Sequence, residues 1–238
     1  MHAPVLIYHK IDVPDKNVLV RGAFTSPARF ARQMAYLKRR GFVFYTASEL
    51  IAHYLERGNF PPKAVALTLD DGWKDSYTNA FPILKELEIK ATIFLVPSCV
   101  GKVSGAVVAE GEAPREHLSR ENILEMSKHG IEFGSHSVNH RHLHELAPDE
   151  IAYEVEESKR QIEEMLQTEC KTFCYPAGFF NDDAKKAVRR AGYIAAFSSV
   201  YGDDEKLDLF ALNRIEILRR DRVPFRFARK VRRLESSF

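Results

Sequence analysis

Cysteine is scarce in this chain, with three residues (Cys99, Cys170 and Cys174) among 238. So small and odd a number excludes a disulfide framework. Without a cluster of thiolates, any metal site must use imidazole and carboxylate ligands. The spacing of Cys170 and Cys174 places both side chains on one face of a strand, but about 13 Å apart. We therefore expect them to pack in the core and not to form a metal or redox pair.

Long apolar runs and a large net charge are also absent. No stretch approaches the roughly 18 to 20 apolar residues that cross a bilayer, and the chain reaches the charged Lys10 and Asp12 too early for a secretory signal. Taken literally, the sequence predicts a cytoplasmic protein; a protein whose signal had been removed would be extracytoplasmic. The formal net charge of +2 gives no reason to expect nucleic acid as a partner.

The chain instead alternates short runs of apolar, β-branched residues with longer segments of helical period. The expected strands are residues 5–8, 65–69, 91–96, 131–133, 172–175, 194–197 and 215–218. The expected helices are residues 26–41, 48–57, 75–87 with a kink near Pro82, 119–128, 149–167 and 182–190, and a long surface loop covers 101–116. With about seven strand–helix units and no Gly-rich dinucleotide motif, the pattern predicts one α/β domain over residues 1–238, a barrel of parallel strands with helices outside.

Two adjacent carboxylates follow the strand at 65–69. Asp70 and Asp71 stand where a buried strand ends, which is where α/β barrels place their active sites. Because neighbouring residues of an extended chain point to opposite sides, the two carboxylates can have different partners. The alternative is a surface turn in which Asp-Asp-Gly only ends the strand.

Two histidines follow the strand at 131–133. His136 and His140 have the i, i+4 spacing that lets two imidazoles on one helical face reach one ion. With Asp71 they form a two-His-one-carboxylate set, which leaves positions open on the metal for water and substrate. The alternative is a solvated polar loop, and we assign the neighbouring His142 and His144 to such a loop.

These two motifs resemble those of the polysaccharide deacetylases, the carbohydrate esterase family with the NodB homology domain. Thr-Leu-Asp-Asp-Gly at 68–72 is similar to the family's T-F-D-D-G motif, and His-Ser-Val-Asn-His at 136–140 to its H-[ST]-x-x-H motif. The resemblance runs from about residue 4 to 217 and implies a distorted (β/α) barrel that removes acetyl groups from amino sugars. It makes Asp70 the general base and assigns the metal ligands as Asp71, His136 and His140. The metal it implies is Zn²⁺, with Co²⁺, Ni²⁺ or Fe²⁺ in some members.

The third family motif, an Arg-Pro-Pro-Tyr-Gly type run, departs from the pattern here. The corresponding stretch reads Phe-Cys-Tyr-Pro-Ala-Gly at 173–178, with Tyr175 and Pro176 on the expected substrate side. Cys174 stands where the family's Arg holds the base, and Ala177 where a Tyr lends its backbone N–H to the oxyanion. A backbone N–H survives a change of side chain, so Ala177 can still stabilise an oxyanion. We hypothesise that Arg214, at the start of the last strand, supplies the missing guanidinium to Asp70.

The family's C-terminal histidine is missing as well, but His9 follows the first strand. The first and last strands of a closed barrel are neighbours, so a histidine can reach one place from either end of the chain. This arrangement resembles the branch of the family that deacetylates poly-N-acetylglucosamine, in which the barrel is circularly permuted. In that branch the N-terminal histidine is the general acid, and the resemblance assigns this role to His9. The alternative is a partly buried, structural histidine.

Trp73 and the basic C-terminus each have two interpretations. Trp73 could stack on a sugar ring or pack at the rim of the barrel. Nine basic and three acidic residues lie between 214 and 238, where a basic helix is expected at about 222–238. This helix could contact an anionic membrane surface or an acidic glycan; the favoured alternative is a helix that packs on the barrel with a solvated basic face.

Three functions are compatible with these residues. The leading one is a metal-dependent deacetylase of an N-acetylated glycan or a small acetylated substrate. The second uses the same metal and base on another amide or an O-acetyl ester, since nothing in the metal site specifies a sugar. The third is a non-catalytic glycan-binding protein on a decayed barrel, and four intact residues argue against it: Asp70, Asp71, His136 and His140. The sequence does not determine the oligomeric state.

Overall fold

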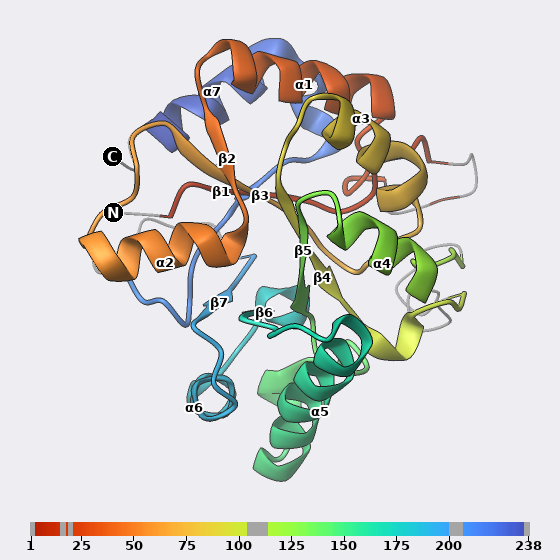
Figure 1. Ribbon diagram of the computed structural model, residues 1–238, viewed down its shortest axis with the longest axis vertical. Coiled ribbons are helices and arrows are strands. Elements are labelled where there is room, and N and C mark those ends of the chain that lie inside the picture. The colour runs from red at the N-terminus through yellow and green to blue at the C-terminus, as the bar shows by residue number, and fades with distance from the viewer. Residues whose placement is uncertain (1–2, 15–17, 19–20, 104–113, 200–206, 236–238) are drawn as a thin grey trace.

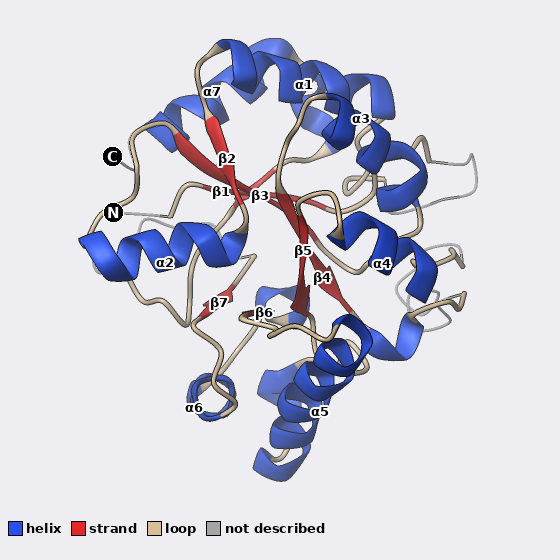
Figure 2. Cartoon of the chain, viewed as in Figure 1, coloured by secondary structure: helices blue, strands red, loops and turns tan. Residues whose placement is uncertain are grey.

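The protein is described from a computed structural model over residues 3–14, 18, 21–103, 114–199 and 207–235. Parallel strands form a curled sheet with helices around it (Figures 1 and 2), which confirms the predicted distorted (β/α) barrel. The strand order is β7-β6-β5-β4-β3-β1-β8. The strands are β1 (Val5–Tyr8), β2 (Val43–Tyr45), β3 (Ala64–Leu69), β4 (Ala91–Leu95), β5 (Ile131–Ser135), β6 (Thr172–Cys174), β7 (Ala195–Phe197) and β8 (Ile215–Glu216).

The helices lie close to the ranges expected from the sequence. They are α1 (Pro27–Arg39), α2 (Ala47–Arg57), α3 (Phe81–Glu86), α4 (Arg120–Ser127), α5 (Pro148–Leu166), α6 (Asp182–Arg190) and α7 (Pro224–Glu235). The kink predicted near Pro82 is present as a π-helical turn, Ser76–Ala80, that runs directly into α3. No helix among the described residues is long and apolar enough to span a bilayer. Most of the predicted loop 101–116 lies outside the described residues.

The sequence analysis missed strand β2. It pairs with the first half of β3, whereas β4 pairs with the second half. Val43 is 52% exposed, and the other two residues of β2 are half-buried. A three-residue strand with an exposed end lacks the apolar alternation by which the other strands were found.

The two ends of the sheet are joined by the chain that leads into β8. Leu212 exchanges hydrogen bonds with β7, accepting from Ser198 N at 2.8 Å and donating to Ala196 O at 2.9 Å. Strand β8 then pairs with β1, through Leu6 opposite Ile215. The first and last strands are therefore neighbours, as the barrel prediction requires.

Alternation along β3 places residues of different size on its two faces. Val65, Leu67 and Leu69 belong to the large core cluster that packs against the outer helices. Ala64 and Ala66 belong to a smaller cluster that includes Phe94, Phe197 and residues of α2. Thr68 shares the face of the two alanines, and its buried hydroxyl contacts the Arg214 guanidinium at 3.1 Å. This inner face continues to Asp70, which explains how its carboxylate enters the barrel.

Asp75 is a buried carboxylate that fastens the loop after β1 to the loop after β3. Its Oδ1 accepts a hydrogen bond from Ile11 N at 3.0 Å, and Arg115 lies 3.5 Å from its Oδ2. Burial raises the pKa of Asp75 to about 6. A carboxyl group whose pKa is higher in the folded state binds more protons when folded, so it favours folding at low pH. Its contribution is complete below the pKa of the unfolded chain and is lost as the pH rises to about 6.

Asp75→Asn should therefore stabilise the protein at neutral pH relative to wild type. The free energy of unfolding of the variant minus that of wild type is expected to increase by about 2–3 kcal/mol between pH 4 and 7. Urea titrations at several pH values measure this difference. Glu56→Gln, which changes an exposed carboxylate, is the control and should give a difference independent of pH. A flat difference for Asp75→Asn would contradict the burial argument.

Candidate metal centre and active site

The carboxyl ends of neighbouring strands bring the predicted site residues together. Asp70 and Asp71 follow β3, and His9 follows β1, whose Tyr8 lies opposite Leu69. His136 follows β5 in the same way, with its backbone N–H bonded to Leu95 O at the end of β4. Parallel strands end at one edge of the sheet, so these side chains share one end of the barrel.

Asp71, His136 and His140 form a compact donor cluster. The Oδ1 atom of Asp71 lies 3.4 Å from His136 Nε2 and 3.5 Å from His140 Nε2. One ligand atom from each residue lies within 4.8 Å of the other two. Two imidazoles and one carboxylate at this separation fit a divalent ion with positions left open for water and substrate.

The two histidines do not share a helical face, contrary to the sequence-based interpretation. Residues 136–142 form a loop in which Ser137 and His140 have left-handed backbone conformations, with φ of 62° and 57°. Ser137 Oγ accepts from His140 N at 3.0 Å, and Glu154 on α5 accepts from the backbone N and the side-chain Nδ2 of Asn139. The i, i+4 spacing therefore brings the imidazoles together through a hydrogen-bonded loop, with ring centroids 4.8 Å apart.

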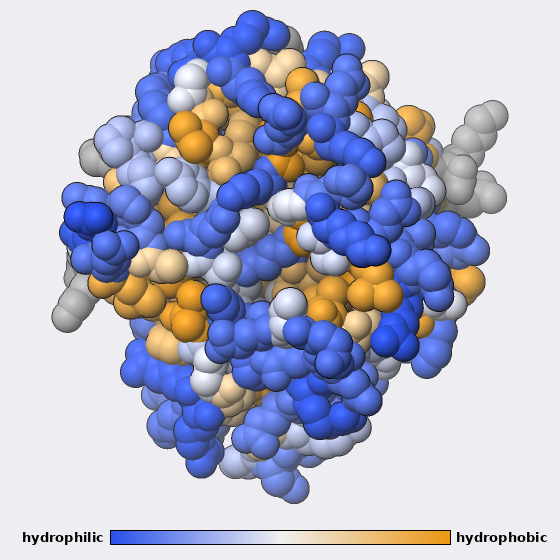
Figure 3. Space-filling model, viewed as in Figure 1, coloured by the Kyte–Doolittle hydropathy of each residue, from blue (hydrophilic) through white to orange (hydrophobic). Residues whose placement is uncertain are grey.

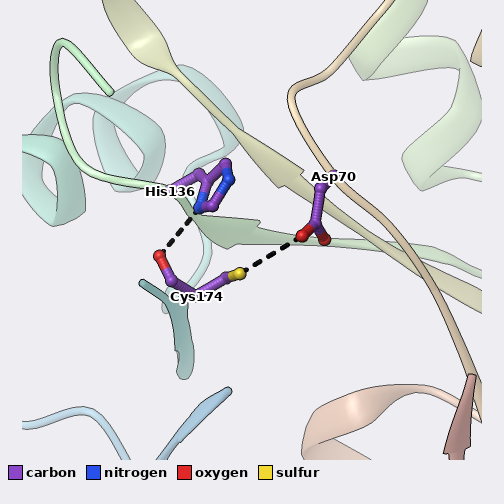
Figure 4. Close-up of side chains that lie close together, drawn as sticks. All are labelled: Asp70, His136 and Cys174. Carbon is purple, nitrogen blue, oxygen red and sulfur yellow. Dashed lines mark hydrogen bonds between the residues drawn. The ribbon is translucent and has the colours of Figure 1, made fainter. Parts of the chain in front are cut away.

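A hydrogen bond orients the His136 ring toward Asp71, and burial sets the protonation state of His140. His136 Nδ1 contacts the carbonyl oxygen of Cys174 at 2.8 Å (Figure 4), which places the proton on Nδ1 and leaves Nε2 to face Asp71. Burial and the nearby His136 lower the pKa of His140 to about 4, so this ring is neutral at pH 7. Although burial opposes it, contact with the two histidines holds the pKa of Asp71 well below its usual range. Although burial opposes it, contact with Cys174 and Asp71 raises the pKa of His136 well above its ordinary value, so a metal that binds Nε2 would displace a proton from this ring.

Asp70 is held by Arg214 inside the barrel. The guanidinium donates to both carboxylate oxygens at 2.7 Å, and Arg214 Nε donates to Ser198 O at 3.0 Å. Both side chains are almost completely buried, at 0% exposure for Arg214 and 2% for Asp70. Burial raises the pKa of Asp70, but the charge and hydrogen bonds of Arg214 outweigh it and lower this pKa below its ordinary value. Arg214 therefore occupies the position that we hypothesised for it, and Asp70 is an ionised hydrogen-bond acceptor at neutral pH.

Cys174 contacts both parts of the site: its side chain contacts Asp70 and Arg214, and its carbonyl oxygen contacts His136 of the Asp71 cluster. Its Sγ lies 3.4 Å from Asp70 Oδ2 (Figure 4) and 3.0 Å from the Arg214 guanidinium. Asp70, His136 and Cys174 form a second group whose ligand atoms lie within 4.8 Å of one another. Burial raises the pKa of the Cys174 thiol, however, so it remains protonated and donates to Asp70. Cys174 therefore supports the carboxylate and the imidazole, and of the two groups the Asp71 cluster has the donor set that fits a divalent ion.

Trp73 and His117 support Asp71 from the other side. Trp73 is 1% exposed, and its Nε1–H donates to Asp71 Oδ2 at 2.8 Å. The His117 ring packs on the indole at 4.2 Å, and His117 Nδ1 contacts Asp71 O at 2.9 Å. The ammonium group of Lys10 lies 4.5 Å from the centre of the indole. Of the two interpretations of Trp73, packing describes the structure, and stacking on a sugar is not available to so buried a ring. No sequence signal pointed to His117.

Trp73→Phe should weaken metal binding without unfolding the protein. The indole N–H fixes one carboxylate oxygen of Asp71 so that the other faces the histidines, and loss of such support typically costs about 10- to 100-fold in metal affinity. Competition of Zn²⁺ with a chromophoric chelator measures this affinity. Tyr153→Phe, at an exposed aromatic residue of α5, is the control. An unchanged dissociation constant in Trp73→Phe would show that Asp71 is oriented by other contacts.

The remaining predicted residues differ in their access to the site. His9 is half-buried, its Nδ1 has no hydrogen-bond partner among the described residues, and it lies close enough to Asp70 and Asp71 to contribute to the lowered pKa of both carboxyl groups. Ala177 is exposed on the loop after β6, in a left-handed conformation with φ of 54°. Tyr175 is buried and donates to Phe210 O at 2.9 Å, and Pro176 is also buried. Their side chains therefore shape the loop that carries Ala177 and do not face a substrate.

Gly178 follows Ala177 and allows the loop to approach the next strand. Its φ is +78°, and a Cβ at this position would lie 2.5 Å from Ser199 N. Only glycine fits both the left-handed conformation and this close approach. The Ser198 hydroxyl donates to Gly178 O at 2.8 Å, which fixes the loop that presents the Ala177 N–H.

A curled parallel sheet with carboxylates and imidazoles gathered at its carboxyl edge is the arrangement of a (β/α)-barrel enzyme. The family model for polysaccharide deacetylases matches residues 57–196 of this chain. The chain belongs to the polysaccharide deacetylase family.

Relatives extend this similarity beyond the matched region. The poly-β-1,6-N-acetyl-D-glucosamine N-deacetylase of Staphylococcus aureus is 28% identical over 191 residues, which are 75% of this chain and 62% of that protein. The Bacillus subtilis protein YxkH is 28% identical over 221 residues, covering 90% of this chain and 71% of that one. The deacetylase PplD of Streptococcus pyogenes, solved in complex with acetate, superposes with a TM-score of 0.79 and 29% identity over 92% of this chain and 93% of that one. IcaB from Ammonifex degensii has the same fold, with a TM-score of 0.75, 22% identity and coverage of 97% and 96%.

Proposed function

We propose that this protein is a metal-dependent hydrolase that removes acetyl groups from N-acetylated amino sugars in a polysaccharide. The observation that carries the proposal is the pairing of two sites at one end of the barrel. The Asp71, His136 and His140 cluster provides a metal donor set, and beside it Asp70 is an ionised carboxylate held by Arg214. A metal site next to a fixed basic group is what amide hydrolysis requires.

The residues of the chain divide the chemistry among them. A divalent ion held by Asp71, His136 and His140 supplies a Lewis acid that makes water more acidic and polarises a carbonyl group. Asp70 accepts the proton of the attacking water, and Arg214 keeps its carboxylate ionised and oriented. The backbone N–H of Ala177 donates to the oxyanion that develops on the acetamide oxygen. His9 in its protonated form gives a proton to the departing amine, so that acetate and a free amino sugar are released.

The experiment that tests this function is an acetate-release screen. Purified protein is stripped with a chelator, reloaded with Zn²⁺ or Co²⁺, and incubated with β-1,6-linked N-acetylglucosamine oligomers, acetylxylan and small N-acetyl amides. We expect acetate from the N-acetylglucosamine oligomers with either metal and none from the stripped protein. Release from acetylxylan alone would identify an O-acetyl esterase on the same site. Release that is independent of metal would refute the proposal.

His140→Ala should lose metal occupancy itself. Removal of one of three protein ligands leaves two, and we expect metal affinity to fall by at least about 100-fold, since even the loss of a supporting contact costs 10- to 100-fold. Elemental analysis after dialysis against a metal buffer measures occupancy. His144→Ala is the matched control, because that imidazole lies in the 3-10 turn just after the loop and contacts Phe179 and Glu145 instead of the cluster. Equal metal content in the two variants would exclude His140 as a ligand.

A further inference from the structure

Two segments that are far apart in the sequence form one strongly basic face on the outside of the barrel. Residues 21–43 contain six basic and no acidic residues, and residues 217–235 contain eight basic and two acidic residues. The whole chain has 35 basic and 33 acidic residues, so these segments carry a net charge of +12 and the remainder −10. Helices α1 and α7, which lie within these segments, run side by side (Figure 1), and Tyr36 of α1 packs edge-on against Phe227 of α7 at 5.9 Å.

The two acidic residues of this face are already paired. Asp221 is buried and accepts from Lys230 at 2.6 Å. Glu235 pairs with Arg40 at 2.7 Å and also with Lys63. These pairs neutralise Lys230 and Arg40 and leave twelve basic residues in the two segments in excess of the carboxylates. In Figure 3 the upper rim of the view, where α1 and α7 lie in Figure 1, is largely hydrophilic.

Arginine side chains line two adjacent hollows in this face. One hollow, of about 220 Å³, lies between α1 and α7 and is lined by Arg29, Arg32, Gln33, Tyr36, Arg39, Asp221 and Phe227. The other, of about 370 Å³, is lined by Arg21, Gly22, Arg219, Arg220, Val223 and Arg226. They are neighbours, because Arg220 and Arg226 of one are adjacent in sequence to Asp221 and Phe227 of the other.

Gln33 forms part of the buried wall of the first hollow. Its side chain is 5% exposed, and Oε1 accepts a hydrogen bond from the Tyr8 hydroxyl at 3.0 Å. Its Nε2 has no hydrogen-bond partner among the described residues. A buried amide that lacks a partner costs free energy, and this atom is covered by the residues around it. The hollow thus offers three guanidinium groups, the chemistry that recognises a carboxylate, sulfate or phosphate group.

We propose that this face is a second, non-catalytic binding site for an acidic glycan, a sugar polymer whose anionic groups enter the two hollows. The end of this face that is formed by Gly22, Ala23 and Arg219 lies at the edge of the barrel that carries the active site. Arg219 N donates to Gly22 O at 2.8 Å, and Lys10 N, next to His9, donates to Ala23 O at 3.1 Å. A glycan bound along α1 and α7 would be held beside the catalytic edge.

An acidic glycan fits the face better than a bilayer or a single-stranded nucleic acid. A helix that lies on a bilayer buries its apolar side chains in the lipid, but the apolar residues of α7 (Phe227, Val231 and Leu234) are buried against the protein. Single-stranded nucleic acids require aromatic faces on which the bases stack. Among the described residues of α1 and α7, Phe225 is the only large apolar side chain that is exposed. The face is therefore built for anionic groups and not for lipid chains or bases.

The test measures binding of a fluorescent heparin oligosaccharide by anisotropy, with neutral dextran as competitor. Arg32→Glu/Arg226→Glu changes one exposed residue in each hollow. We expect its dissociation constant to rise by about tenfold or more, because a loss of 1.4 kcal/mol already gives this factor. Affinity of the wild type should fall steeply between about 50 and 200 mM salt. Lys128→Glu/Arg190→Glu makes the same change of charge at two exposed residues, the C-cap of α4 and the last residue of α6, and should bind as wild type does.

Three outcomes would overturn the proposal. The first is equal heparin binding by the Arg32→Glu/Arg226→Glu variant and wild type, and the second is an equal loss in the control variant. The third is tighter binding of phosphatidylglycerol vesicles or of DNA than of heparin through the same arginines. Melting temperatures of both variants check that the fold is intact. None of these outcomes depends on the deacetylase activity.

Discussion

Asp70→Asn is expected to lower kcat by about 10²- to 10⁴-fold while the protein keeps its metal. An amide cannot accept the proton of the attacking water, and general base catalysis contributes an effect of this size. The carboxylate is not part of the Asp71, His136 and His140 cluster, so metal content should not change. Initial rates of acetate release and elemental analysis on the same sample measure both quantities.

The same variant separates the two donor groups of the site. Asp70, His136 and Cys174 also lie close enough to hold an ion. If Asp70→Asn lost its metal, the ion would belong to that group and our assignment would be wrong. Activity near that of wild type with full metal content would instead remove Asp70 from the role of base.

Among the single substitutions proposed, Arg214→Met should cause the largest decrease in the free energy of unfolding. Methionine fills much of the volume but leaves the buried Asp70 carboxylate without its partner, which typically costs about 3–5 kcal/mol. Since Arg214 lowers the pKa of Asp70, its loss should raise this pKa. Asp70 acts as a base only when ionised, so the acidic limb of the pH profile of kcat/KM should move to higher pH. Urea unfolding and the pH profile measure the two effects.

Two further variants keep this prediction testable if Arg214→Met does not fold. Arg214→Lys retains the charge but not the two parallel hydrogen bonds, so it should lose less stability and still shift the pH profile. Asp70→Asn/Arg214→Met removes both charges of the pair and should be more stable than the sum of the two single changes predicts. Additive effects on the free energy of unfolding would show that the two residues do not interact as the structure indicates.

The strands that are buried on both faces could be predicted from the sequence. Val5–Tyr8 and Ala64–Leu69 are completely buried, and such strands appear as continuous apolar runs. Strand β2 was missed because part of it is exposed and it has only three residues. The Asp71, His136 and His140 cluster was predicted because local spacing after two strands was enough to point to it. The contact between Arg214 and Asp70 was a hypothesis from the missing Arg of the third motif, and the structure supplied its geometry.

The residues that support Asp70 and Asp71 could not be predicted from the sequence in the same way. His117 approaches Asp71 from a segment 46 residues away, and Cys174 contacts Asp70 across 104 residues. Such contacts have no period and no fixed spacing. The loop conformation of residues 136–142 was also misjudged, because i, i+4 spacing fits both a helix and a loop with left-handed residues.

The sequence by itself determined the alternation of strands and helices, the two motifs and the small number of thiols, because each is encoded by residues close together in the chain. Only the tertiary structure decided which charges meet. It paired the first strand with the last, placed Arg214 on Asp70 and turned Trp73 inward onto Asp71. It also joined two basic segments into one face with hollows, so that a net charge of +2 conceals a site of strongly positive charge. These features depend on packing between distant residues, and packing is determined by the whole fold.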